Sequence, residues 1–129
     1  LSLVGSEMCI RDSTKSDIAL CSNGKILETG TSNIIFIKDN KYYSPIRKFY
    51  RGVNLKFFEK QFKIKKTNIN INKLNQYEEI LLIGSGKGVS TVSSIKEKNW
   101  NRKKYKSYET FVSKYQTKIL KQKKLSNYL

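Results

Sequence analysis

The sequence predicts an α+β domain with a mainly antiparallel sheet. Three observations lead to this fold class: two short strand pairs follow each other near the start, the hydrophobic period changes to that of a helix after residue 54, and strand-like runs return over 80–95. The chain has 129 residues, which is enough for one domain. Because 38% of the residues are hydrophobic and 12% aromatic, we expect a modest core and not a disordered chain.

The first thirteen residues, LSLVGSEMCIRDS, are set apart from this prediction. They resemble the translated sequencing-adapter tail that occurs at broken ends of proteins assembled from metagenomic reads. The alternatives are a natural N-terminus or the start of a signal peptide, and Glu7, Arg11 and Asp12 interrupt the apolar run that a signal peptide needs. We therefore expect residues 1–13 to be non-native and residues 14–129 to form one partial domain that ends in an amphipathic helix.

Two successive hairpins open the domain. Asn23-Gly24 is a strong signal for a two-residue turn, because both central residues of a type I′ turn need positive φ. Asp39-Asn40 predicts a second turn, and Pro45 closes the region. The strands expected around these turns are Asp17–Ser22, Lys25–Glu28, Asn33–Lys38 and Lys41–Ser44.

Helical spacing begins in the segment 52–63. Leu55, Phe58 and Phe62 share one face, and Asn54 is the expected N-cap. The apolar stripe of a second, amphipathic helix begins near Tyr105 and has lysines opposite it. Its expected members are Tyr108, Phe111, Val112, Tyr115, Ile119 and Leu120. Between the two helices we expect a strand within 62–69, a short helix over 71–77 capped by Asn70 or Asn72, and strands over 80–83 and 89–95 separated by a glycine-rich break.

The formal net charge of +16 raises the possibility of nucleic-acid binding. The chain has 22 lysines and only four arginines, whereas base-reading surfaces favour arginine, so we interpret most of the charge as solvated surface. Aromatic residues among lysines at 41–51 and 99–108 keep a basic nucleic-acid-binding module as the alternative function. A non-catalytic dimerising domain is a third hypothesis, suggested only by the C-terminal helix.

Several classes of protein are disfavoured by what the sequence lacks. With no histidine there is no His-based triad and no His metal site, so we expect no metal. Cys21 is the one cysteine beyond residue 13, which favours a reducing compartment, and no apolar run approaches the ~18 residues of a membrane span. We therefore expect a cytoplasmic protein.

Three segments in order resemble a known family: ILETGTSNIIFI at 26–37, GVN at 52–54 and LLIGSGKGVSTV at 81–92. Together with the first hairpin they resemble the large C-terminal domain of class IV (fold-type IV) pyridoxal-phosphate enzymes. That family includes branched-chain aminotransferases, D-amino-acid aminotransferases and aminodeoxychorismate lyases. The resemblance covers roughly residues 17–95 and implies a mainly antiparallel sheet or pseudo-barrel with flanking helices, pyridoxal 5′-phosphate as cofactor, and a homodimer when full length.

The resemblance also implies site residues. Glu28 would face the pyridine nitrogen of the cofactor and keep it protonated, which makes the ring a better electron sink. Gly52, Val53 and Asn54 match the Gly-Ile-Thr turn that holds the cofactor phosphate, although Asn54 departs from the usual threonine. Ser85 matches the hydroxyl of the second phosphate-side turn. Gly86 and Lys87 would lie near the substrate carboxylate, and Lys87-Gly88 in place of the transaminase Ala-Glu inclines this position to the lyase side.

No residue of the chain is assigned the Schiff-base lysine of the family. In relatives this lysine lies upstream of the glutamate, and Lys15 is too close to Glu28 to take its place. The small N-terminal domain of relatives is missing as well. We therefore expect a fragment of a transaminase or lyase of amino-acid or folate-precursor metabolism, acting on an amino-acid or amino-chorismate substrate, that is inactive as given.

Overall fold

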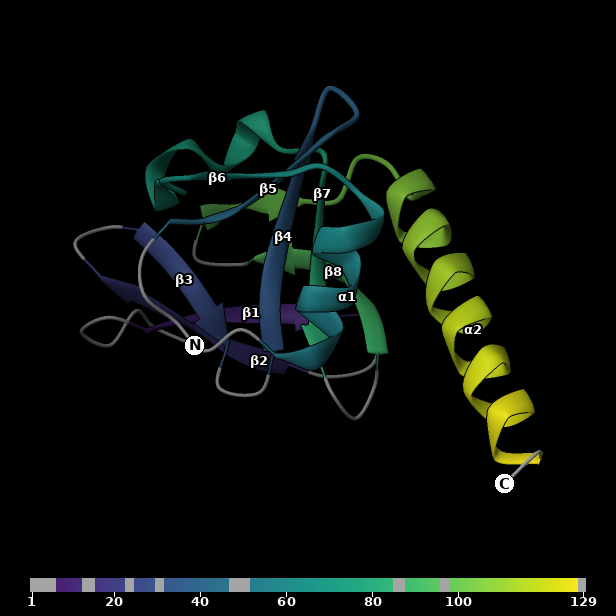
Figure 1. Ribbon diagram of the computed structural model, residues 1–129. Helices are drawn as coiled ribbons and strands as arrows, with labels where there is room; N and C mark the ends of the chain where they lie inside the picture. Colours follow the sequence, from purple (N-terminus) through teal and green to yellow (C-terminus); the bar gives the residue numbers. More distant parts are fainter. Residues whose placement is uncertain are drawn as a thin grey trace.

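The computed structural model describes residues 7–12, 16–22, 25–29, 32–46, 52–84, 88–95 and 98–127. Side chains are described between residues 32 and 125 within these ranges. The elements follow the order β1 (Glu7–Asp12), β2 (Ser16–Ser22), β3 (Lys25–Thr29), β4 (Ser32–Lys38), β5 (Lys41–Pro45), α1 (Val53–Gln61), β6 (Ile64–Thr67), η1 (Ile71–Gln76), β7 (Glu79–Gly84), β8 (Gly88–Ile95), β9 (Trp100–Asn101) and α2 (Lys106–Asn127). The predicted α+β class is confirmed (Figure 1).

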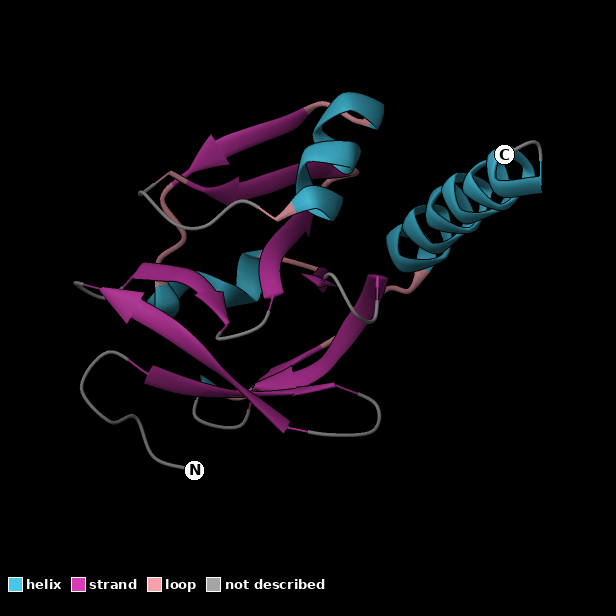
Figure 2. Cartoon of the chain, turned by 60° about the horizontal axis from the view of Figure 1, so that its bottom comes forward, coloured by secondary structure: helices cyan, strands magenta, loops and turns pink. Residues whose placement is uncertain are grey.

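The strands form one strongly curved sheet. Its path is β3-β2-β1-β8-β7-β4-β5-β6, and β9 pairs with β8. A further pairing joins β3 to β4 at Glu28 and Asn33, so six of the strands meet in a ring. All described pairings are antiparallel except that of β5 with β6. Figure 2 shows how the strands curve around while both α-helices lie outside them.

The expected hairpins are present. β2 and β3 pair antiparallel up to Ser22 and Lys25, while the turn residues Asn23-Gly24 lie outside the described residues. Asp39 and Asn40 join β4 to β5 with φ values of 52° and 60°, as a two-residue turn of the primed type requires. The first strand differs from expectation: residues 1–13 were left out of the fold prediction, yet Glu7–Asp12 pair with both β2 and β8.

Both faces of the central strands are buried, which explains their continuous apolar sequences. On β4, Ile34 and Phe36 belong to one hydrophobic cluster, whereas Ile35 and Ile37 belong to a second cluster on the opposite face. β7 divides its side chains in the same way. The first cluster also includes residues of η1 and Trp100, whose indole N–H donates to the Tyr77 carbonyl at 3.0 Å.

The second cluster lies beneath the two α-helices. Leu55 and Phe58 of α1 are buried there, and Phe111 of α2 stacks on Phe62 with ring centroids 4.6 Å apart. The 4.7 Å separation of the Phe58 and Phe111 centroids adds a direct contact between the helices. Aromatic packing therefore holds α1 and α2 against the same face of the sheet.

A buried glutamate fixes the start of α2. Glu79 at the start of β7 is 1% exposed, and its two carboxylate oxygens accept hydrogen bonds from the Ser107 and Tyr108 N–H groups, each at 3.1 Å. A negative charge at this end of a helix satisfies orphan N–H groups and interacts favourably with the helix dipole. No local pattern in the sequence distinguishes Glu79 from an ordinary surface glutamate.

Three details of the sequence prediction are wrong or incomplete. The N-cap of α1 is Gly52, not Asn54, because the helix begins two residues earlier than expected, and it has no side-chain cap. The apolar stripe of α2 is used only in its first half: Phe111 is fully buried, but Ile119 and Leu120 are 36% and 60% exposed. The C-terminal half of α2 runs beyond the sheet (Figure 1), and the stripe has no strand beneath it there. The short strand β9 was not predicted at all.

Candidate functional site

Four chain segments meet at one end of the sheet, at the lower edge of the view in Figure 1. Glu28 near the end of β3 pairs with Asn33 at the start of β4, and Ser32 pairs with Gly84 at the end of β7. α1 begins beside them at Gly52. We call this meeting point the junction. It contains the acidic position and the starting points of both small-residue turns that the sequence singled out.

Asn33 ties the strands to the helix. Its side chain is 5% exposed, and its Oδ1 accepts a hydrogen bond from the Gly52 N–H at 3.0 Å. Gly52 has φ −68° and ψ 164°, extended values that any residue adopts, so the glycine is not needed for backbone strain. The Gly52 amide is occupied within the protein, and Asn33, five residues after Glu28, has a structural role at the junction.

The first turn of α1 carries the remaining donors of the predicted GVN turn. The Val53 side chain is 69% exposed, so a role for Val53 rests on its backbone N–H, as the sequence analysis assumed. The N–H groups of Val53, Asn54 and Leu55 open the helix, where no earlier carbonyl of the same helix is available to accept them. Together with the positive end of the helix dipole, this is a donor set suited to an anion.

The Asn54 side chain joins the start of α1 to two other segments of the chain. It is 6% exposed; its Nδ2 donates to the Gly84 carbonyl at 2.8 Å, and its Oδ1 accepts from Lys118 Nζ of α2 at 2.8 Å. The side chain thus connects α1, the end of β7 and α2. Its carbonyl oxygen and one amide proton are in use, so the backbone N–H is its clearest donor toward a ligand.

The second predicted turn lies between Gly84 and Gly88. Ser85, Gly86 and Lys87 fall outside the described residues, so their predicted roles stay predictions. Both ends of the turn are described: Gly84 accepts from Asn54, and Gly88 has φ +72° with the Tyr115 ring directly against it. A Cβ on Gly88 would lie 2.4 Å from Tyr115 Cε1, so α2 packs closely over the exit of the turn.

Sequence reasoning missed the contribution of α2 to this site. Lys118 and Tyr115 were interpreted as parts of a generic amphipathic helix. The one available signal is spacing, because Lys118 follows Phe111 by seven residues and Tyr115 by three, which places it on the edge of the buried stripe. That spacing does not identify Asn54 as its partner.

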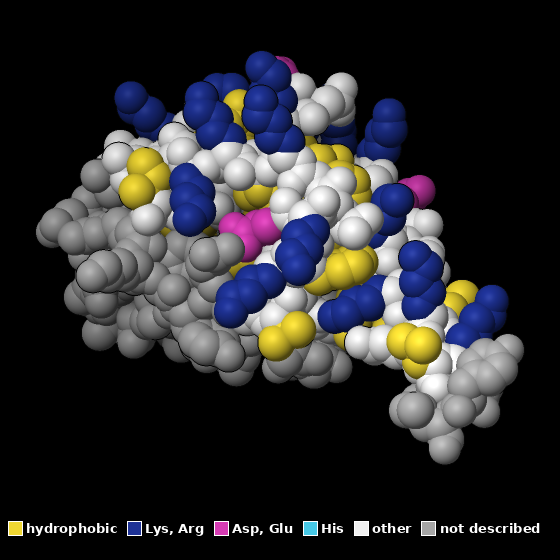
Figure 3. Space-filling model, viewed as in Figure 1, with side chains coloured by type: hydrophobic (Ala, Val, Ile, Leu, Met, Phe, Trp, Pro, Cys, Tyr) yellow, Lys and Arg dark blue, Asp and Glu magenta, His cyan; other side chains and the backbone are white. Residues whose placement is uncertain are grey.

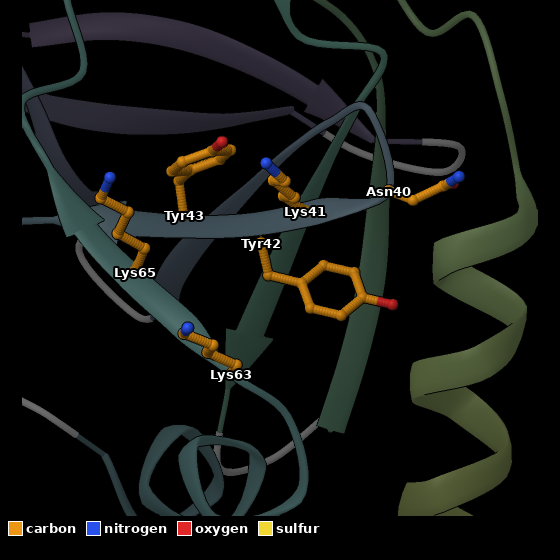
Figure 4. Close-up of a pocket in the computed structure, with 6 residues that line it drawn as sticks. All are labelled: Asn40, Lys41, Tyr42, Tyr43, Lys63 and Lys65. Carbon is orange, nitrogen blue, oxygen red and sulfur yellow. The ribbon is translucent and has the colours of Figure 1, made fainter.

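A cavity separate from the junction lies at the edge of the sheet, on β5 and β6. It has a volume of about 380 Å³ and is lined by Asn40, Lys41, Tyr42, Tyr43, Lys63 and Lys65. Figure 4 shows the ammonium groups of Lys41 and Lys65 beside the Tyr43 ring, while Tyr42 points away toward α2. Within the described part of the chain, Lys41, Lys63 and Lys65 have no ion-pair partner.

The charge elsewhere is dispersed. Figure 3 shows lysine and arginine side chains scattered over the visible face with few acidic groups among them. Lys104 pairs with Glu78 at 2.6 Å, and Glu78 also accepts from the Asp39 N–H at 2.9 Å. The hydrogen bond from Lys104 is the main reason why the pKa of Glu78 lies below its ordinary value of 4.5.

Two other kinds of site are absent from the described ranges. No helix there is both long and apolar enough for a membrane crossing. The same residues contain no cluster of three or more His, Cys, Asp or Glu side chains that could hold a metal ion.

Comparison with known proteins points to one family. The sequence profile of Amino-transferase class IV matches residues 11–95. None of the curated proteins matches the chain significantly. The profile match covers β2 to β8 and therefore includes the whole junction except Lys118 and Tyr115.

Solved structures share the fold. A protein from Thermotoga maritima assigned as a branched-chain amino acid aminotransferase has a TM-score of 0.70 and 19% identity over 81% of this chain and 41% of its own. The 4-amino-4-deoxychorismate lyase from Pseudomonas aeruginosa has a TM-score of 0.60 and 17% identity over 70% of this chain and 36% of its own. An aminotransferase from Brucella abortus bound to pyridoxal phosphate has a TM-score of 0.58 and 17% identity over 74% of this chain and 37% of its own. The chain thus spans about two fifths of the length of these relatives.

Proposed function

Because the chain belongs to the amino-transferase class IV family, we propose that it is part of a pyridoxal-phosphate-dependent transaminase or aminodeoxychorismate-lyase-like enzyme, and that the junction is its cofactor site. The observation that carries the proposal is the meeting of Glu28, the start of α1 and the end of β7 at one end of the sheet. In this proposal Glu28, Gly52, Val53, Asn54 and Ser85 serve the cofactor, and Gly86 and Lys87 serve the substrate carboxylate.

The phosphate of the cofactor would bind at the start of α1. The N–H groups of Val53, Asn54 and Leu55 are available there, whereas that of Gly52 donates to Asn33. Lys118 adds a positive charge 2.8 Å from Asn54 Oδ1. A dianionic phosphate suits this combination of first-turn amides, helix dipole and ammonium.

Glu28 would act at the opposite end of the cofactor ring. Its backbone pairs with Asn33, whose side chain contacts Gly52, so one residue links the acidic position to the phosphate end. A carboxylate beside the ring nitrogen keeps that nitrogen protonated, and the bound cofactor then stabilises negative charge formed at the substrate Cα. Transaminases and lyases share this requirement, and Lys87-Gly88 inclines the assignment slightly to the lyase side.

No residue of this chain is assigned the role of the lysine that binds the cofactor covalently and moves the Cα proton. Turnover is therefore a property proposed for a longer enzyme, and we predict that this chain by itself does not turn over an amino substrate. Cofactor binding is the property that the chain itself can test.

The test uses pyridoxamine 5′-phosphate, a fluorescent form of the cofactor that needs no covalent lysine. Val53→Pro removes one first-turn N–H but suits the helix, because proline is favoured at the first helical position and Gly52 already has the extended conformation that precedes proline. We expect the dissociation constant to rise by roughly ten- to a hundredfold, the value of one hydrogen bond to a charged group. Val53→Ala keeps the N–H and is the matched control.

The comparison ligand is pyridoxamine, which lacks the phosphate. Val53→Pro should leave its binding unchanged, because the deleted donor faces the phosphate. Equal binding of pyridoxamine 5′-phosphate by the proline and alanine variants would contradict a phosphate site at the start of α1. Absence of saturable binding by the unaltered chain would contradict the proposed cofactor site as a whole.

The cavity on β5 and β6 favours the second candidate function, a basic nucleic-acid-binding module. Three lysines and the Tyr43 ring line its 380 Å³, which is a suitable combination for a stacked base with a neighbouring phosphate. The other predicted segment gives less support, because Trp100 is 1% exposed and cannot stack on a base. Titration with a single-stranded oligonucleotide at two salt concentrations tests this function: tight, steeply salt-dependent binding that weakens in Tyr43→Ala would favour it.

A further inference from the structure

The C-terminal helix contributes one side chain to the junction. Lys118 of α2 reaches α1, where its Nζ lies 2.8 Å from Asn54 Oδ1. The family profile ends at residue 95, so this helix lies outside the matched segment. We propose that Lys118 is a positioning residue for the phosphate end of the cofactor site, an inference that rests on the proposed function.

The chemistry of the contact fixes the orientation of Asn54. An ammonium group only donates hydrogen bonds, so the carbonyl oxygen of the Asn54 side chain must face Lys118. The amide nitrogen then faces the other way and donates to the Gly84 carbonyl at 2.8 Å. One lysine thereby determines how the first turn of α1 is joined to the end of β7.

The ammonium group is held in place by its surroundings. Lys118 Nζ lies 5.1 Å from the centroid of the Phe57 ring and 5.9 Å from that of the Tyr115 ring, distances at which the face of an aromatic ring attracts a cation. The side chain is half-buried. These contacts keep the charge of Lys118 near the start of α1, so the ammonium group does not extend into bulk solvent.

α2 itself is fixed at several points. Glu79 caps its start, Phe111 is fully buried against α1, and Tyr115 packs on Gly88. Lys118 lies one turn beyond Tyr115, so packing of the helix sets the position of the ammonium group. The path from α2 to the junction is a chain of direct contacts.

Loss of Lys118 should act on the phosphate specifically. Without the ammonium, the Asn54 amide has no charged donor to orient it, and a positive charge 2.8 Å from Asn54 Oδ1 is lost. Lys118→Met keeps the unbranched apolar stem that lies against Phe57. We expect pyridoxamine 5′-phosphate to bind about tenfold more weakly to this variant, with pyridoxamine unaffected.

The matched control is Lys121→Met. Lys121 lines the same groove of about 230 Å³ between α1 and α2 as Lys118 does, and its loss changes the net charge by the same amount. Among the described residues it makes no hydrogen bond to Asn54, whereas Lys118 does. We expect Lys121→Met to bind both ligands as the unaltered chain does.

A second readout is the Asn54 side-chain amide in ¹⁵N–¹H NMR spectra, followed without any ligand. Its protons should be protected and dispersed in the unaltered chain and in Lys121→Met, and should move toward solvent-like shifts in Lys118→Met. If Lys118→Met behaves like Lys121→Met in both the titration and the spectra, the positioning role is wrong while the cofactor site can stand. If the unaltered chain does not bind pyridoxamine 5′-phosphate, the proposed function fails, and an unchanged Asn54 signal in Lys118→Met would still overturn the positioning role separately.

Discussion

Gly88→Ala should be strongly destabilising, and its magnitude follows from two features of the structure. The residue has φ +72°, which costs an alanine about 1–2 kcal/mol. A Cβ would also lie 2.4 Å from Tyr115 Cε1 and 2.8 Å from Tyr115 Cδ1, so the ring of the half-buried tyrosine must shift, which costs a further 1–3 kcal/mol or so. We expect the free energy of unfolding to fall by about 2–5 kcal/mol.

The matched control is Gly52→Ala. Gly52 has φ −68°, and a Cβ there would meet Asn33 Oδ1 at 3.4 Å, an ordinary contact. Its substitution should change the free energy of unfolding by less than about 0.5 kcal/mol. Each of the two glycines lies at one end of a predicted functional turn, but the same added methyl group should destabilise the protein only at Gly88.

Urea denaturation followed by circular dichroism measures both effects. A shift in the unfolding midpoint reports a change in stability when the dependence of the unfolding free energy on urea concentration, the m-value, is the same in both variants. A Tyr115→Ala background separates the two costs, because removal of the ring should reduce the effect of Gly88→Ala to the backbone part of about 1–2 kcal/mol. The reasoning is refuted if Gly88→Ala is as mild as Gly52→Ala, or if the effect of Gly88→Ala is the same with and without the Tyr115 ring.

Three further predictions concern α2 and its surroundings. Phe111→Ala should lower the free energy of unfolding by about 3–5 kcal/mol in urea denaturation, because the ring is fully buried between α1 and the sheet. Leu125→Ala is the control and should change the free energy of unfolding little, because the Leu125 side chain is 66% exposed. Similar effects of the two substitutions would contradict the packing described. Glu79→Ala should cost about 2–4 kcal/mol by leaving the Ser107 and Tyr108 N–H groups without an acceptor, and Glu79→Gln should recover part of this; an alanine variant as stable as the unaltered chain would exclude the capping role. The lowered pKa of Glu78 means that its contribution to stability is complete above the ordinary value of 4.5 and is lost as the pH falls through the lower folded value. In thermal melts, the unaltered chain should therefore lose its stability advantage over Glu78→Gln on acidification. A difference between the two that does not depend on pH would contradict the ion pair.

The local elements of this fold could be predicted because their signals are local. Asp39-Asn40 adopts the positive φ values that its sequence indicates, and Asn70 caps η1 by accepting from the Asn72 N–H at 2.8 Å. The strands β4 and β7 were recognised from apolar runs of four residues. In each case the chain within a few residues of the element contains the reason for it.

The site could be predicted only in part because its geometry depends on contacts between distant residues. The sequence indicated Glu28 and Gly52 but not that Asn33 Oδ1 would take the Gly52 N–H. Asn54 was expected as a helix cap, yet partners 30 and 64 residues away determine its orientation. The pattern of residues within a single helix does not predict which distant residues will bond to Asn54.

The end of α2 shows the limit of periodicity as a signal. A stripe of apolar side chains predicts a buried face but not how far the partner surface extends. Ile119 and Leu120 continue the pattern and are nevertheless exposed, because the sheet ends beneath the first half of the helix. Glu79 illustrates the converse, since a glutamate beside an apolar run carries no sign that it will be buried to cap a helix 28 residues later.

The central claim is that the junction, and not the cavity on β5 and β6, receives the phosphorylated cofactor. A ¹⁵N–¹H NMR titration of the chain with pyridoxamine 5′-phosphate tests it most directly. The account predicts saturable shifts at the amides of Val53, Asn54, Gly84 and Gly88. Shifts confined to the residues around Lys63 and Lys65, or no saturable shifts at all, would contradict it.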